Sequence, residues 1–218
     1  MSVFILTGAY KIYISLVDHY YIAQTIISFE HRAQMTYLVL KKNISFAGDA
    51  RCLPEHTKEN LNPIVFYQPR LTDKKSGTDA LSLQRCIHFK NKMEWKDISF
   101  FIRNSHRKTT NNLPIFSLYR KIGSAPSEEL ISGISYMDVC YITAEDNHSS
   151  QCLKANQLTQ QKNIWGIHIK LLLDSLTPIK HSLAFYFLKN TQRKRLHKNI
   201  FIIAPIQEKE NKYEKRAW

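Results

Sequence analysis

The chain has little glycine or proline and few cysteines: 6 Gly, 7 Pro and 4 Cys in 218 residues. These numbers exclude a Gly/Pro low-complexity protein and a disulfide-dense scaffold. No uninterrupted apolar run reaches the roughly 18–20 residues that a membrane-spanning helix needs, so we expect no integral membrane insertion. The first residues also lack the order of basic, apolar and small residues that marks a cleaved secretory signal.

Motifs that indicate an enzyme are missing as well. The sequence contains no Gly-x-Gly-x-x-Gly, no phosphate-binding Walker loop, no Gly-x-Ser-x-Gly and no His-Glu-x-x-His. We therefore predict a protein that is not an enzyme and uses no cofactor. A catalytic site assembled in space from distant residues would leave no such pattern, and the sequence does not address that alternative.

The four cysteines, Cys52, Cys86, Cys140 and Cys152, are irregularly spaced, and no Cys-x-x-Cys occurs. This spacing indicates neither a zinc ribbon nor a thioredoxin-type redox pair. An even number is compatible with two disulfides, and the sequence does not say which cysteines would pair. Without a secretory signal we expect reduced thiols and an intracellular protein, nuclear or cytoplasmic.

Potential metal ligands crowd into one short stretch, 138–152. The cysteines there are twelve residues apart, not the two to four of zinc motifs, and hard and soft ligands are mixed. We predict an acidic loop without a metal. The residues weighed are Asp138, Cys140, Glu145, Asp146, His148 and Cys152.

Hydrophobic patterning predicts a β-rich α+β fold with several short strands and one or two helices. The clearest pattern is Trp165–Asp174, where apolar residues alternate with mostly polar ones. Tyr10–Leu16 alternates in part and is also interpreted as a strand, whereas Asp18–Gln34 could instead be a helix. The other ordered segments that we expect are Met35–Leu40, Ile64–Tyr67, Leu81–Phe89, Met93–Arg103, Pro114–Ile122, Leu130–Thr143, Leu183–Leu188 and Ile200–Ile203.

Glycine and proline divide the chain into four segments. We predict an Ile/Tyr-rich N-terminal segment (1–47), a connector (48–80), a main β-rich domain (81–206) and a charged tail (207–218). Ile (24) far outnumbers Val (5), although both suit strands about equally. Codon bias therefore explains part of the composition, and a chain that is only partly ordered is an alternative to a fully packed one.

Positive charge is the one strong global signal. The chain has 31 Lys and Arg against 18 Asp and Glu, a net charge of +13. The stretch 122–152 has no Lys or Arg, whereas the residues after it are strongly basic. Either the two blocks pair within the molecule, or the basic block meets an external anion.

Two basic stretches are candidates for contact with nucleic acid or an acidic protein. The first interleaves cations with Trp95, Phe100 and Phe101, the composition that suits single strands, although the two phenylalanines fit a buried strand better. The second is a compact cluster typical of phosphate contacts and of nuclear import signals. The candidate residues are Lys90, Lys92, Lys96, Arg103, Arg107, Lys108, Arg193, Lys194, Arg195 and Lys198.

The sequence thus predicts a non-enzymatic, basic interaction protein that binds nucleic acid or an acidic partner. A second hypothesis is the product of a recently arisen or weakly constrained reading frame with no defined activity. A third is association with a membrane surface through the Ile/Tyr-rich N-terminus together with Lys41 and Lys42. Oligomeric state is not predicted.

Overall fold

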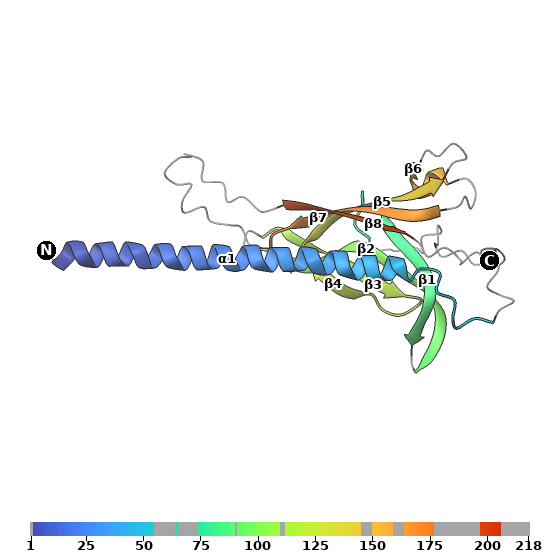
Figure 1. Ribbon diagram of the computed structural model, residues 1–218. Coiled ribbons are helices and arrows are strands. Elements are labelled where there is room, and N and C mark those ends of the chain that lie inside the picture. Colours follow the sequence, from blue (N-terminus) through green and yellow to red (C-terminus); the bar gives the residue numbers. More distant parts are fainter. Residues whose placement is uncertain are drawn as a thin grey trace, which may run out of the picture.

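The computed structural model describes residues 2–54, 64, 74–89, 91–109, 112–144, 150–158, 164–176 and 197–205. They form one long helix, α1 (Ser2–Ser45), and two four-stranded antiparallel sheets (Figure 1). The β-rich α+β class is therefore confirmed. Because the chain has no Gly or Pro between Ala9 and Ala47, nothing interrupts the helix there. Gly48, at a φ of 82°, lies in the turn that follows the helix, where its amide donates to the Gln84 carbonyl at 2.7 Å.

The first sheet has the order β1-β2-β3-β4, with strands β1 (Ala80–Phe89), β2 (Lys92–Lys108), β3 (Pro114–Ile122) and β4 (Glu128–Ser132). The second has the order β6-β5-β7-β8, with β5 (Ile134–Ala144), β6 (Ser150–Leu153), β7 (Ile164–Asp174) and β8 (His197–Pro205). A short 3₁₀ turn, η2 (Ala155–Gln157), follows β6. The two sheets face each other across a common hydrophobic core.

The strand pattern of β7 is confirmed. Its alternate residues Ile167, Ile169, Leu171 and Leu173 are completely buried, as one core-facing side of a strand requires. In β2, Phe100 and Phe101 are buried on opposite faces of the sheet, so they belong to the core and do not present rings to bases. The single segment that we expected at Leu130–Thr143 is two strands in different sheets, joined at Gly133.

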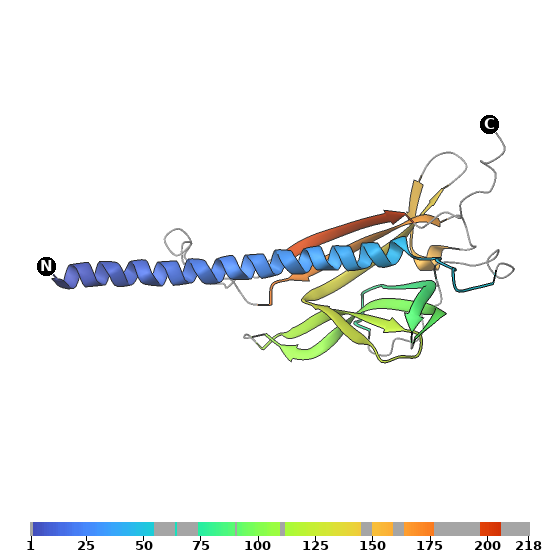
Figure 2. The same ribbon diagram turned by 60° about the horizontal axis from the view of Figure 1, so that its bottom comes forward.

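The strand that we predicted at Tyr10–Leu16 is wrong, and so is the β interpretation of Met35–Leu40, because both segments belong to α1. In a nearly continuous apolar stretch, alternation fits a strand and a helix equally well. The second half of α1 lies along the opening between the two sheets, against β4 and β8 at their edges (Figure 2). Its buried residues, Phe29, Ala33, Thr36, Leu40, Asn43 and Ile44, recur every three or four positions.

Within the connector that we predicted, Ile64 forms an isolated bridge with Leu83, and Lys74 forms one with Arg103. The rest of Ile64–Tyr67, all of Leu183–Leu188 and the tail after 206 lie outside the described residues. The division into four segments stays a prediction. The second half of α1 nevertheless shares its core with both sheets.

Candidate functional site

The first half of α1 extends beyond the two sheets (Figures 1 and 2). We call residues 4–27 the projecting segment. No side chain in it is buried, and the first buried residue of the helix is Phe29. The large apolar side chains that it exposes are Phe4, Ile5, Leu6, Tyr10, Ile12, Tyr13, Ile14, Leu16, Tyr20, Tyr21, Ile26 and Ile27.

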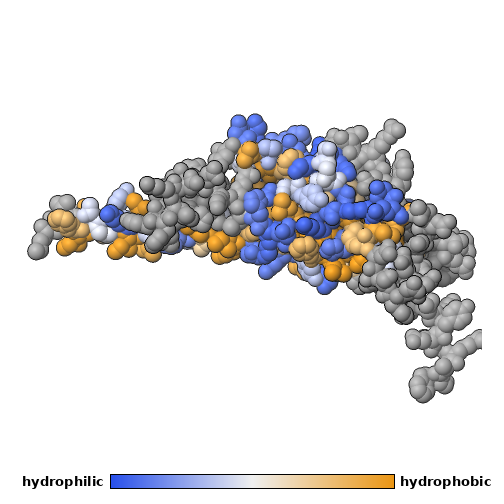
Figure 3. All heavy atoms as spheres, turned by 90° about the horizontal axis from the view of Figure 1, so that it is seen from above, coloured by the Kyte–Doolittle hydropathy of each residue, from blue (hydrophilic) through white to orange (hydrophobic). Residues whose placement is uncertain are grey.

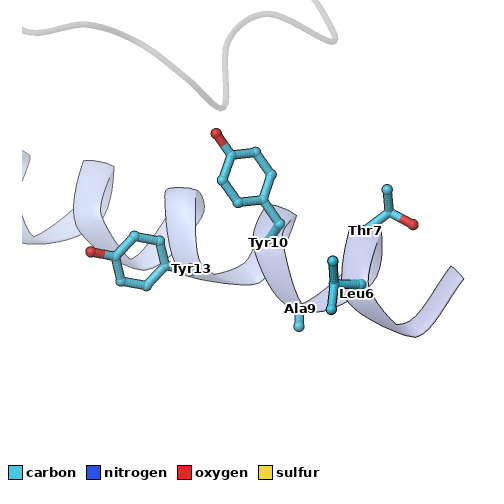
Figure 4. A pocket seen from close by; sticks show the side chains of 5 residues that line it. All are labelled: Leu6, Thr7, Ala9, Tyr10 and Tyr13. Atoms are coloured by element: carbon cyan, nitrogen blue, oxygen red, sulfur yellow. The ribbon is translucent and has the colours of Figure 1, made fainter. Parts of the chain in front are cut away.

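These apolar side chains surround the helix and do not form a single stripe. Leu6, Tyr10 and Tyr13 project from successive turns and line a shallow hollow with Thr7 and Ala9 (Figure 4). Hydrophobic residues follow the visible side of the segment in Figure 3, whereas much of the visible sandwich surface is hydrophilic. A helix that is apolar all round is normally buried inside a larger structure. Large exposed apolar patches are typical of interaction sites.

Three polar side chains of the projecting segment donate hydrogen bonds within the helix. Thr25 donates to the carbonyl oxygen of Tyr21 at 2.9 Å, Thr7 to that of Phe4 at 3.2 Å, and Gln24 to the Tyr20 hydroxyl at 2.6 Å. Groups that are already hydrogen-bonded are less costly to remove from water than free ones. The segment has just two charged side chains, Lys11 and Asp18. It is therefore suited to burial against other apolar helices.

The part of the chain that the structure describes contains no helix both long enough and apolar enough to cross a membrane.

The basic residues that we predicted as a site are spread along the molecule. Lys92 and Lys108 are exposed at opposite ends of β2, and sixteen steps of extended strand correspond to about 50 Å. Lys90, Arg193, Lys194 and Arg195 lie outside the described residues. The five described cations between 92 and 108 are therefore distributed along the length of β2.

Several of these cations are paired with carboxylates of the same chain. The Lys96 ammonium lies 2.8 Å from Glu94, Arg107 pairs with Glu129, and Lys198 pairs with Glu30 on α1. Arg103 donates to the Ser127 hydroxyl at 3.1 Å, and its guanidinium lies over the Tyr119 ring. Such pairing weakens the field that an external anion would feel.

The acidic block is paired in the same way. Glu128 pairs with Arg120, and Asp138 pairs with Lys154, which also lies 2.9 Å from Asp79. The hydrogen bond from Lys154 lowers the pKa of Asp138 although partial burial opposes it. Among the described residues, one pair, Asp138–Lys154, joins the acidic block to the basic block that follows it, whereas Glu128, Glu129 and Lys198 pair with residues outside the two blocks.

The cysteines are oxidised, which corrects the expectation of reduced thiols. Cys52 is bonded to Cys86, and Cys140 to Cys152. The turn after α1 brings Cys52 beside Cys86 of β1, and the pairing of β5 with β6 brings Cys140 beside Cys152, at Cα separations of 5.7 and 5.4 Å. The sequence contains no signal for it, since neither spacing matches a known pattern.

His168 lies beside the second disulfide, its Nδ1 atom 3.6 Å from the Cys140 sulfur. The ligand atoms of Cys140, Cys152 and His168 are within 4.8 Å of one another. Two sulfurs bonded to each other are not thiolate ligands, so the oxidised chain offers no zinc site here. His168 was not among the ligands that we weighed, whereas Glu145, Asp146 and His148 lie outside the described residues.

Comparison of the chain with family models, curated proteins and solved structures finds no match.

Proposed function

We propose that this protein is a non-enzymatic assembly subunit that buries its projecting segment among helices of neighbouring subunits. One observation carries the proposal: a continuous helix exposes apolar side chains on all sides between Phe4 and Ile27, and none of them is buried. Burial of one large apolar side chain contributes about 2 kcal/mol. The free energy gained by burying most of these side chains therefore exceeds the roughly 4–15 kcal/mol that association costs.

Helices of protein partners suit the segment better than lipid does. Its four tyrosines, Tyr10, Tyr13, Tyr20 and Tyr21, combine a large apolar ring with a hydroxyl that can hydrogen-bond to a protein partner, and such side chains are enriched at protein interfaces. Lys11 and Asp18 would likewise need partners of opposite charge. Because the exposed residues surround the helix, more than one neighbour is needed to cover them.

The two disulfides favour an oxidising compartment for such an assembly, since reducing compartments keep thiols free. The nuclear or cytoplasmic location expected from the sequence stays an untested prediction. Nucleic-acid binding also stays a prediction, with less support than before because Lys96, Arg107 and Lys198 are paired with carboxylates.

Sedimentation velocity of the full chain at rising concentration tests the proposal. We expect oligomers for the natural sequence and a monomer for a variant with Ile12→Gln and Leu16→Gln, two residues that are each 63% exposed. The matched control replaces Phe201 and Ile203 on β8, 55% and 63% exposed, with Gln, and should assemble normally.

A natural chain that stays monomeric at every concentration and floats with liposomes would contradict the proposal and favour the membrane-surface hypothesis. Equal loss of assembly in both variants would also contradict it, because the segment would then have no special part. Broad, non-cooperative thermal melting of the natural chain would instead favour a weakly constrained product.

A further inference from the structure

A basic groove lies on the first sheet beside the C-terminal end of α1, away from the projecting segment. Its volume is about 390 Å³, within the range of small-molecule sites. Its polar lining comes from α1, from the turn that follows it, and from strands β1 and β3. The residues that define the groove here are Lys42, Phe46, Asp49, Arg51, Arg85 and Arg120.

Four of these side chains are cationic and one is a carboxylate. The carboxylate is already engaged, because Arg51 donates from Nε to Asp49 Oδ1 at 2.9 Å and from Nη2 to Oδ2 at 2.7 Å. These hydrogen bonds lower the pKa of Asp49 and keep it ionised. Because Asp49 is held by Arg51 and Arg120 pairs with Glu128 outside the lining, two cations of the groove, Lys42 and Arg85, have no carboxylate partner among the described residues.

Arg85 is the least satisfied of the cations. Its Nε atom is buried and has no hydrogen-bond partner. Burial lowers the pKa of Arg85, and the like charge of Arg120 lowers it further, with Asp49 opposing both. Lys96, Arg107, Lys154 and Lys198 each have a carboxylate partner elsewhere in the molecule, whereas no ion pair of Arg85 is found among the described residues.

The surroundings hold these groups in place. The Arg85 guanidinium lies over the ring of Phe46, 5.8 Å from its centroid. Arg120 is anchored by Glu128, and Cys86, the neighbour of Arg85, is tied to Cys52 by a disulfide. A set of donors fixed before a ligand arrives loses little entropy on binding it.

We propose that the basic groove binds a phosphate-type oxyanion. Guanidinium groups match the oxygens of such an ion with paired N–H donors. The ion would accept hydrogen bonds from the guanidinium groups that line the groove and would offset the like charges of Arg85 and Arg120. The ion could be free or the terminal group of a larger molecule, and the groove is open enough for either.

Isothermal titration of the full chain with inorganic phosphate, against chloride at equal ionic strength, tests this proposal. Arg85→Gln is expected to weaken binding about tenfold, as loss of a charged hydrogen bond does. Arg51→Gln, at a side chain that is 76% exposed, should also weaken it, because it removes one cation and frees the Asp49 carboxylate. Lys121→Gln is the matched control, since Lys121 neighbours Arg120 in β3 but does not line the groove.

Adenosine monophosphate forms the second arm of the experiment. Equal affinity for both compounds would support the proposal and assign the site to a terminal phosphate group, whereas binding of inorganic phosphate alone would support it for the free ion. Absence of phosphate binding beyond that of chloride would overturn it. So would equal affinities of all three variants, or binding of an oligonucleotide without binding of phosphate. Assembly through the projecting segment is measured separately and does not depend on the result.

Discussion

Gly133 shows how much of the architecture can depend on one residue. It connects β4 in one sheet to β5 in the other with a φ of 87°. Its amide donates to the Phe116 carbonyl at 2.8 Å, and its carbonyl accepts from the Asp174 amide at 2.7 Å. Beside it, Arg32 of α1 donates to the Ser132 carbonyl at 3.0 Å, so helix and both sheets meet at this point.

Gly133→Ala is predicted to destabilise the protein by about 2–4 kcal/mol. A Cβ atom there would lie 2.7 Å from the Asp174 carbonyl oxygen and would collide with the Arg32 guanidinium, in addition to the strain of the positive φ. The control is Gly77→Ala, where φ is 74° but no atom lies within 4 Å, so strain acts alone and costs about 1 kcal/mol. Urea unfolding measures both, and equal losses would contradict the role of the close contacts.

Tyr141 gives a prediction for alkaline pH. Burial raises the pKa of Tyr141 to about 12 from the ordinary value of 10.0, and the nearby charge of Asp79 adds to this. Because the folded-state pKa is raised, the protonated tyrosine stabilises the fold fully below pH 10. This contribution, about 2–3 kcal/mol, is lost as the pH rises from 10 towards 12.

Denaturant unfolding of the natural chain and of Tyr141→Phe across this pH range measures the effect. The variant is expected to lose less stability between pH 10 and 12 than the natural chain does, whatever its stability at neutral pH. Parallel pH profiles would show that Tyr141 does not titrate as described.

At the scale of elements, the strands were easier to predict than the helix. The alternating apolar residues of Trp165–Asp174 predicted β7, which lies between β5 and β8 in the second sheet. The segment expected at Pro114–Ile122 has the same bounds as β3. The buried side of α1 has helical spacing, but it includes Ala33, Thr36 and Asn43, which carry little hydrophobic signal. The first half of α1 is apolar on all sides although it projects beyond the two sheets, and local sequence does not reveal where the sheets end.

The arginines of the basic groove could not be predicted as a site, because their proximity depends on the fold. Arg51 and Arg85 have no neighbouring cation in the sequence, and Arg120 has only Lys121 beside it. Strand pairing and the turn after α1 bring the three arginines to one groove. Conversely, the clustered cations predicted contact with an external anion, although carboxylates of the same chain pair with several of them. The net charge was known from the sequence, whereas its compensation depends on the fold.

The disulfides differ in the length of chain that they constrain. Cys52–Cys86 spans 34 residues and Cys140–Cys152 spans 12. Replacing the first pair with Ala is predicted to cost about 4 kcal/mol and the second about 3 kcal/mol, because a longer loop gains more entropy in the unfolded chain. Guanidinium unfolding without reductant measures both losses, and a greater loss for the second pair would contradict the entropic argument.

At the scale of the whole molecule, the charges of the projecting segment bear on how copies would pack. Lys11 and Asp18 are seven residues apart, which is close to two turns and places them on one side of the helix. Two parallel helices displaced by about 10 Å would bring Lys11 of one copy beside Asp18 of the next. This arrangement depends on the proposed assembly.

We predict that Lys11→Asp or Asp18→Lys alone weakens assembly about tenfold or more, since like charges then face each other in an apolar interface. The double variant with both exchanges should regain most of the loss, because it restores opposite charges. Sedimentation equilibrium measures the three dissociation constants. A double variant no better than either single one would exclude this register while leaving assembly by other contacts open.

The uninterrupted course of α1 has a mechanical consequence. Half of one rod is fixed between the edges of two sheets, held there by Arg32 and by the Lys198–Glu30 pair, and the other half continues without a hinge. A load applied to the sandwich would travel along the rod's axis into whatever grips its free end. Torque would be transmitted in the same way, so the contacts that hold the projecting segment would also set the orientation of the two sheets.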